Sequence, residues 1–228
     1  MHPFVRGMIA MCPILLGVIP FGLVMGAACS TQNLSLVELL SFNLLVFAGA
    51  SQFVALELMS QKAAIVVVVL SGVVINLRML LYSAGISPLL KKASFFKRML
   101  AAYGITDQAY AVLMANESKL KSTEVSLGFY AGAAFAMAAC WQIVVVLGYV
   151  FGNFAPASLN LDFAIPLSFV ALVLPSMKSR SYYLVGLCSA FFSVLLHGLP
   201  YSLGLLFSAF IALALAVVFV MKKGLENE

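Results

Sequence analysis

Polar and small residues inside long apolar stretches are the candidates for chemistry in this sequence. The first group is the run Gly49, Ala50, Ser51 and Gln52, which interrupts an apolar segment. Small side chains let a backbone or a ligand approach closely, and an unwound turn exposes carbonyl and N–H groups that can hold the two charged ends of an amino acid. The alternative is a close helix–helix contact in which Gln52 forms a hydrogen bond across the interface.

The second group, Asn76 and Arg78, lies about two thirds of the way along the next apolar segment. Arg78 shares a helical stripe with Ser71, Tyr82 and Gly85. An arginine within lipid costs about 2.5–3.5 kcal/mol on insertion scales. Its guanidinium must therefore face protein or water, or snorkel to the membrane interface.

Two carboxylates are candidates for proton coupling. Asp107 shares a helical face with Tyr103 and Tyr110, and a carboxyl at membrane depth is suited to a proton relay. Pairing with Arg78 would instead satisfy both charges without a transport role, and both interpretations hold if the pair opens during a cycle. Glu57 is the second candidate, although it lies close to the end of its segment.

The composition excludes a water-soluble domain. Of the 228 residues 64% are apolar and 9% are charged, with a mean hydropathy of +1.10, whereas soluble domains carry about 25% charged residues. Because a transmembrane helix needs about 20 apolar residues, we expect an all-α polytopic membrane protein with about seven or eight hydrophobic segments, forming a single transmembrane domain over 1–228. The sequence shows no phosphate-binding or hydrolase motif and no metal-ligand spacing of its four Cys and two His. We therefore expect no enzyme, no cofactor and no metal.

The distribution of Lys and Arg argues against eight full crossings. The apolar segments run over 7–28, 37–60, 63–85, 99–115, 127–151, 163–177, 181–197 and 203–221. If all of them cross, most basic residues lie on the cytoplasmic side, but the basic cluster within 87–98 falls outside, against the positive-inside rule. We therefore expect one or two segments to be broken or re-entrant, and the second and fourth are the candidates.

A two-fold internal repeat is suggested by two similar stretches. Residues 47–56 and 163–172 are identical at six of ten positions, about half the chain apart. This similarity predicts two halves, 7–116 and 123–221, although a chain rich in Phe, Ala, Val and Leu also matches itself by chance. Interruptions at corresponding places in two halves point to a transporter's binding site, so Pro166 and Ser168 join the first group as candidates.

At these positions the sequence resembles the AzlC family, the large subunits of bacterial branched-chain amino acid exporters, also called BrnF-type. The resemblance rests on Phe-Ala-Gly-Ala-Ser-Gln-Phe at 47–53, on Asn-Leu-Arg at 76–78, on Thr-Asp at 106–107 and on Leu-Asp-Phe-Ala at 161–164, and spans nearly the whole chain. It implies a multi-pass secondary exporter of Leu, Ile and Val, with Met in some members, in the bacterial cytoplasmic (inner) membrane.

The resemblance also implies a small AzlD-type partner subunit, and we expect it to dock on G-x-x-x-G faces such as 22–26, 128–132 and 148–152. The family commonly reads N-L-R-H and T-D-E, where this chain has Met79 and Gln108. Proton coupling would then depend on Asp107 or Glu57. We expect export driven by the proton-motive force, with the substrate side chain held by Phe47, Phe53, Phe163 or Phe169. The alternative is a non-transporting membrane scaffold or assembly subunit whose buried charges are structural ion pairs.

Overall fold

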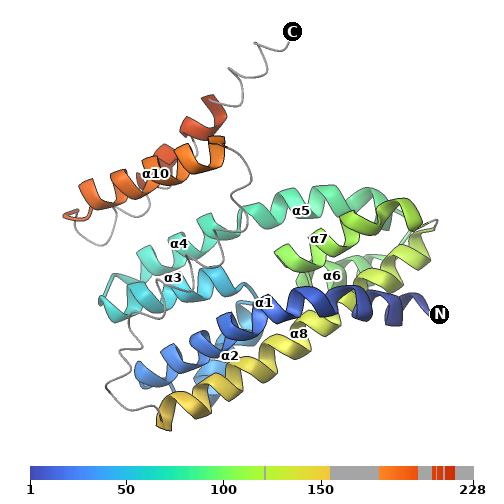
Figure 1. Cartoon of the computed structure of the whole chain (residues 1–228), viewed down its shortest axis with the longest axis horizontal. Coiled ribbons are helices and arrows are strands. Elements are labelled where there is room, and N and C mark those ends of the chain that lie inside the picture. Colours follow the sequence, from blue (N-terminus) through green and yellow to red (C-terminus); the bar gives the residue numbers. More distant parts are fainter. Residues whose placement is uncertain (121, 155–179, 200–206, 209, 213, 219–228) are drawn as a thin grey trace.

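The computed structural model describes residues 1–120, 122–154, 180–199, 207–208, 210–212 and 214–218. This part of the chain is helical and contains no strand, which confirms the expected all-α membrane protein (Figure 1). The main helices are α1 (Pro3–Thr31), α2 (Leu36–Leu45), α3 (Gly49–Ser60), α4 (Ile65–Asn76), α5 (Arg78–Ile86), α6 (Phe95–Tyr103), α7 (Asp107–Asn116), α8 (Thr123–Phe154) and α10 (Arg180–Leu195), and two short 3-10 turns are η1 (Ser87–Leu90) and η2 (Glu117–Lys119).

Three stretches of helix in the described residues are long and apolar enough to cross a membrane. They are Pro3–Thr31, Ile65–Leu90 and Thr123–Gly152. The middle one is α4, α5 and η1 in series, with a single break in the α-helix at Leu77. The predicted second and fourth apolar segments are each divided into two short helices, α2 with α3 and α6 with α7.

The first and last of these spans, α1 and α8, lie side by side along their length and run parallel (Figure 1). Glycines bring their backbones into direct contact. A Cβ atom on Gly7 would lie 1.9 Å from the Phe129 carbonyl oxygen, and one on Gly26 would lie 2.0 Å from that of Val145. Because these contacts advance in the same direction along both helices, α1 and α8 cross the membrane from the same face.

The G-x-x-x-G faces belong to this contact and not to a partner. Added Cβ atoms would meet α1 or α8 at all six of their glycines, Gly22, Gly26, Gly128, Gly132, Gly148 and Gly152. The expectation that these faces dock a second subunit is therefore wrong, because the chain's own helices already occupy them.

The segment α2–α3 enters the bundle and turns back. Tyr149 Oη donates to the Leu34 carbonyl, and Asn43 Nδ2 donates to Gln142 Oε1, so α2 runs antiparallel to α8. Gln52 Nε2 then donates to Asn43 Oδ1 at 2.8 Å. Residues nine apart in a continuous helix would be about 13 Å apart along its axis. The chain therefore reverses at the break between α2 and α3.

The return of α3 is fixed by its contacts with α4. At the inner ends of the two helices Asn76 Nδ2 donates to Ser51 Oγ at 3.1 Å. Toward the α3–α4 turn, Leu58 belongs to a buried cluster with Val67 and Val68. Since α3 and α4 run antiparallel, α2 and α3 form a re-entrant hairpin that begins and ends at the face where α1 ends.

The segment α6–α7 makes a second hairpin, from the opposite face. The helix α6 lies beside the first half of α8. After the break, α7 begins where Asp107 pairs with Arg78, and runs outward along α5 until Tyr110 lies against Gly85. Both ends of this hairpin therefore lie at the face where α1 and α8 begin.

Two hairpins that do not cross explain the charge distribution. With three spans and two hairpins in the described N-terminal part, the basic cluster at 91–98 lies at the same face as Arg6 and Lys119. Lys62, in the α3–α4 turn, lies at the other face. The structure thus agrees with the expectation, drawn from the positive-inside rule, that the second and fourth segments do not cross fully.

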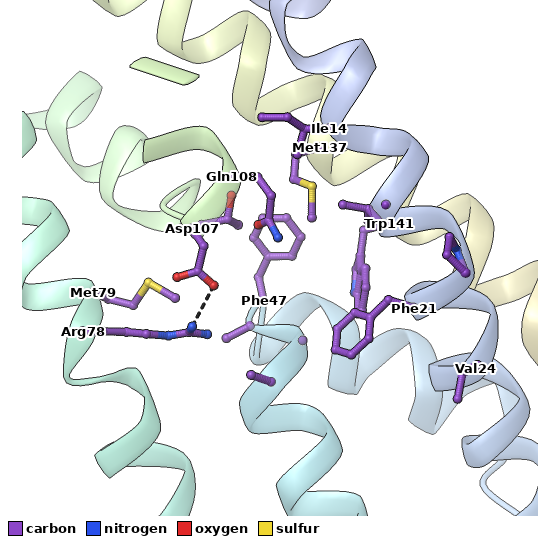
Figure 2. A pocket seen from close by; sticks show the side chains of 17 residues that line it. Ile14, Phe21, Val24, Phe47, Arg78, Met79, Asp107, Gln108, Met137 and Trp141 are labelled. Atoms are coloured by element: carbon purple, nitrogen blue, oxygen red, sulfur yellow. Dashed lines mark ion pairs between the residues drawn. The ribbon is translucent and has the colours of Figure 1, made fainter. Parts of the chain in front are cut away.

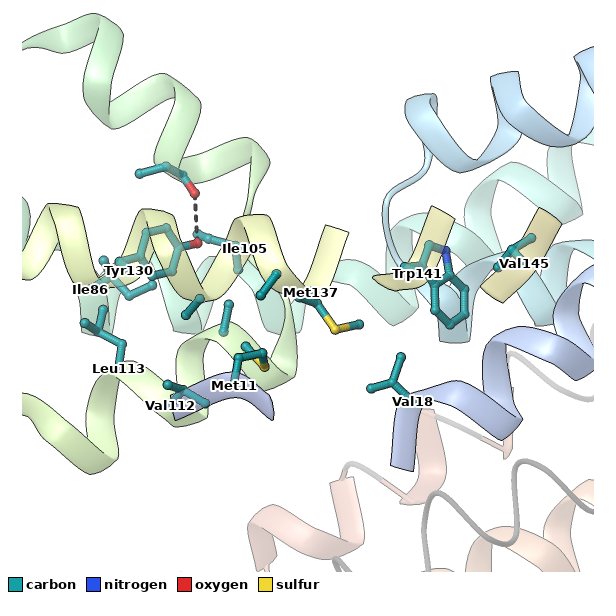
Figure 3. Close-up of a cluster of buried hydrophobic side chains, with 14 of the residues drawn as sticks. Met11, Val18, Ile86, Ile105, Val112, Leu113, Tyr130, Met137, Trp141 and Val145 are labelled. Carbon is teal, nitrogen blue, oxygen red and sulfur yellow. Dashed lines mark hydrogen bonds between the residues drawn. The ribbon is translucent and has the colours of Figure 1, made fainter. Parts of the chain in front are cut away.

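A buried apolar core joins α1, α5, α7 and α8 and supports the second hairpin (Figure 3). Tyr130 is 1% exposed within it, and its hydroxyl donates to the Ala101 carbonyl of α6. This core therefore holds both arms of the hairpin and fixes where α7 begins. Its other members on these four helices include Met11, Ile86, Leu113, Phe129 and Met137.

Candidate functional site

The tips of both hairpins and the break at Leu77 open on one cavity, which α1 and α8 close from the other side (Figure 2). Its volume is about 320 Å³, within the usual range for small-molecule sites. Most of the lining is apolar, with few polar groups. The lining residues are Ile14, Gly17, Val18, Pro20, Phe21 and Val24 of α1, Phe47 to Ala50, Arg78, Met79, Thr106 to Gln108, and Met137 and Trp141 of α8.

An ion pair forms one wall of the cavity. Arg78 Nη1 lies 2.8 Å from Asp107 Oδ2, and the two side chains are 31% and 35% exposed. Tyr82 Oη donates to the other carboxylate oxygen of Asp107 at 2.7 Å. Arg78 therefore pairs inside the protein and does not snorkel to the interface. The pair is the one anticipated from the sequence, and it is in contact with the space a ligand would occupy.

Local sequence at the second hairpin places the carboxylate. Thr106 is extended and its Oγ1 accepts from the Ala109 N–H at 3.1 Å, so it caps α7 and fixes Asp107 as the first helical residue. The ring of Tyr110 stacks on Tyr82 with centroids 4.5 Å apart. Gly85 leaves room for it, because a Cβ there would lie 2.7 Å from the Tyr110 hydroxyl.

The opposite wall is aromatic (Figure 2). The ring centroids of Phe21 and Trp141 are 5.7 Å apart, and those of Phe21 and Phe53 are 4.7 Å apart. Phe53 is fully buried behind this wall and does not line the cavity, whereas Phe47 does. A Cβ on Gly49 would lie 2.9 Å from Trp141 Cη2, so glycine is needed for the indole to approach α3.

The N-terminus of α3 opens onto the same cavity. Gly49 and Ala50, its first two residues, line the cavity. No side chain in the described part of the chain caps this helix, in contrast to α7. The first N–H groups of a helix have no intrahelical acceptor and carry a partial positive charge. The cavity therefore has hydrogen-bond donors at one side and the Asp107 carboxylate at another.

A second cavity of about 700 Å³ lies on the far side of the first hairpin's tip. Ser51 and Asn76 line this second cavity and are hydrogen-bonded to each other. Phe47, Ala48 and Met79 line both cavities. These three residues are therefore the partition between the two spaces.

Gln52, one of the candidates, lines neither cavity. It is fully buried, and its amide donates to Asn43, which in turn donates to Gln142. This chain of amides ties α2, α3 and α8 together, as the packing interpretation of Gln52 expected. Asn43 and Gln142 were missed from the sequence, although each is a polar residue in the middle of an apolar segment, the signal that singled out Gln52.

The remaining candidates lie elsewhere. Glu57 lines neither cavity, and its carboxylate accepts from Gln61 Nε2 at 2.7 Å near the end of α3. Pro166 and Ser168 lie outside the described residues, so their binding role stays a prediction, as does the internal repeat. Within the described residues no group of three or more His, Cys, Asp or Glu could hold a metal ion.

Residues 13–155 match the family model described as AzlC protein. The chain belongs to the AzlC family. Among its relatives, an uncharacterized membrane protein of Archaeoglobus fulgidus is 31% identical over 78% of this chain and 77% of the relative. The inner membrane protein YgaZ of Escherichia coli is 24% identical over 86% of this chain and 83% of its own length. An uncharacterized membrane protein of Helicobacter pylori is 24% identical over 98% of this chain and 99% of the relative. No solved structure matches the chain.

Two uncharged residues stand directly beside the ion pair in this AzlC-family protein. Met79 follows Arg78 and Gln108 follows Asp107. Both line the cavity. Neither residue adds a titratable group to the cavity.

Proposed function

We propose that this AzlC-family membrane protein is the transport subunit of a secondary exporter of branched-chain amino acids, Leu, Ile and Val with Met as a further substrate, driven by the proton-motive force. The observation that carries the proposal is the cavity at the hairpin tips, which combines a mostly apolar lining with the Arg78–Asp107 pair and the open end of α3. A zwitterion with an apolar side chain needs these three features.

The substrate's two charged ends have complementary partners in the cavity. The ammonium would lie at Asp107, since a carboxylate attracts it, and the carboxylate would lie at Arg78 or the first N–H groups of α3. The aliphatic side chain would contact Phe47, Ile14 and the other apolar lining residues. Polar amino acids would lose the apolar contacts and leave polar atoms unpaired.

The energy source is tested by efflux from cells loaded with labelled leucine. An uncoupler should stop export, whereas depletion of ATP with the proton-motive force clamped should not. Lysine serves as the polar control and should not be exported. Export that fails under ATP depletion alone would contradict the secondary mechanism.

The proposal includes a small AzlD-type partner in the bacterial cytoplasmic membrane. The name of YgaZ, an inner membrane protein, supports the location. The helix α4 has large apolar side chains that the described residues do not cover. Ile65 and Val66, for example, are 70% and 62% exposed, so lipid or a partner subunit would have to cover them. Co-expression with the gene for a four-helix membrane protein encoded alongside should be needed for leucine efflux.

The second candidate function is a non-transporting scaffold, and the direct contact between Arg78 and Asp107 favours it, because a pair that satisfies itself needs no ligand. The double variant Arg78→Gln with Asp107→Asn removes both charges together. If the protein is a scaffold, this variant should still assemble with its partner proteins, and leucine export by the cell should be unchanged. A transport subunit should fold and lose efflux.

A further inference from the structure

Trp141 is the one tryptophan in the chain, and its indole nitrogen is a buried donor that forms no hydrogen bond with the described residues. The residue is 3% exposed, and its indole Nε1 has no hydrogen-bond partner among the described residues. An indole N–H can only donate. A buried donor without an acceptor is costly and calls for an explanation.

The unused donor lies beside the open end of α3. The indole lines the cavity, and the edge that carries Cζ2 and Cη2 is the edge that faces Gly49, at 3.2 and 2.9 Å from the place of an added Cβ. Nε1 is next to Cζ2 across one ring carbon, so it lies on this same edge. The other edge, at Cε3, faces Gly22 of α1.

Two sets of donors therefore lie close to each other at one end of the cavity. The first N–H groups of α3, at Gly49 and Ala50, have no capping side chain among the described residues, and the Trp141 N–H has no acceptor. Asp107 lies on the opposite wall (Figure 2). A group that accepts several hydrogen bonds and carries negative charge would satisfy the donors at the α3 end.

We propose that Trp141 and the N-terminus of α3 form the carboxylate subsite, with the Trp141 N–H donating to the substrate carboxylate and its ring limiting the size of the substrate beside it. This inference rests on the proposed function, since it assigns one end of the same amino acid. It leaves the ammonium to Asp107, so the substrate lies across the cavity from the aromatic wall to the ion pair.

The fluorescence of Trp141 can report ligand binding directly, because no other tryptophan contributes to the emission of the purified chain. Titration of the full chain in lipid nanodiscs with leucine should produce a saturable change in tryptophan emission, with the same midpoint as equilibrium dialysis of labelled leucine. Lysine should produce no change.

The variant Trp141→Phe removes the N–H and keeps an aromatic ring. It should bind leucine about tenfold more weakly, the size expected for a hydrogen bond to a charged group. Leucinamide lacks the negative charge. Its dissociation constant, measured by competition with labelled leucine, should therefore be almost the same in the variant and the wild type. The variant Phe21→Leu is the packing control, because it alters the same aromatic wall without removing a donor, and should weaken both ligands alike.

The outcomes separate this inference from the proposed function. The carboxylate subsite is overturned if labelled leucine binds the wild type but the Trp141 emission does not change. It is also overturned if Trp141→Phe keeps the wild-type preference for leucine over leucinamide. In both cases the proposed export function stands. If no branched-chain amino acid binds the wild type, both are overturned.

Discussion

Among single residues, Asp107 is central to the proposed export. Its two carboxylate oxygens are held separately, one by Arg78 and the other by the Tyr82 hydroxyl. A proton on the carboxyl would remove the charge that holds the guanidinium. Under the proposed export function, proton binding by Asp107 would be coupled to the opening of the ion pair through this one side chain.

The variant Asp107→Asn should fold and lose the proposed proton-coupled export by at least about tenfold, because the amide can neither titrate nor form an ion pair with Arg78. Efflux of labelled leucine from vesicles, measured with and without an imposed pH gradient, checks this. Glu57→Gln is the matched control, since Glu57 lies outside both cavities. Full gradient-dependent export by the Asp107 variant would contradict the proton-coupling role of Asp107. Loss of export only in the Glu57 variant would assign proton coupling to Glu57.

The sequence indicated the ion pair but not the residues opposite it. Arg78 and Asp107 stood out because charges are rare within apolar segments. Trp141 did not, since an aromatic residue in an apolar segment is ordinary, and its unused N–H exists only once neighbours are in place. Gln52 stood out for its polarity, but its partner Asn43 is brought to it by a chain reversal that local sequence does not encode.

Among the helices, α1 and α8 form the frame on which the hairpins rest. Backbone contact through glycines makes this frame sensitive to a single methyl group. Gly26→Ala would place a Cβ 2.0 Å from the Val145 carbonyl oxygen, and the helices would have to separate.

Gly26→Ala should destabilise the purified protein by about 1–3 kcal/mol, the cost of overpacking, and lower its thermal unfolding midpoint in detergent. Gly17→Ala, on the same helix, is the control, because an added Cβ there would meet nothing within 4 Å. It should leave the midpoint unchanged or raise it, since alanine favours helix. Equal behaviour of the two variants would contradict the close parallel contact.

The breaks in the second and fourth segments were predicted, but the break at Leu77 was not, and the direction of the chain after each break was only partly predictable. Small and polar residues at 48–52 mark the first position, and the fourth segment is short and polar, but a helix can either continue or return after such a break. Hydropathy does not distinguish these cases. The basic cluster at 91–98 bears on the first break only, because it could reach the face of Arg6 only if an odd number of the three earlier segments failed to cross.

At the scale of the whole molecule, the two hairpins enter from opposite faces and meet at the cavity, which is the arrangement of discontinuous helices used by transporters with a central binding site. The partition of Phe47, Ala48 and Met79 then separates the cavity at the ion pair from the second cavity beside Ser51. Two residues of the partition, Phe47 and Ala48, lie at the tip of the first hairpin, and Met79 lies on α5.

The re-entrant topology makes a prediction that full crossings cannot share. Single cysteines at Thr31, Ser60 and Ser94 are placed in a chain whose four native cysteines are replaced by serine or alanine, and each is treated with a membrane-impermeant maleimide in intact cells and inverted vesicles. The structure places positions 31 and 60 at one face, flanking the first hairpin, and position 94 at the other. Thr31→Cys and Ser60→Cys should react in intact cells, and Ser94→Cys only in inverted vesicles. With full crossings, positions 31 and 94 would react together and position 60 would react from the opposite side.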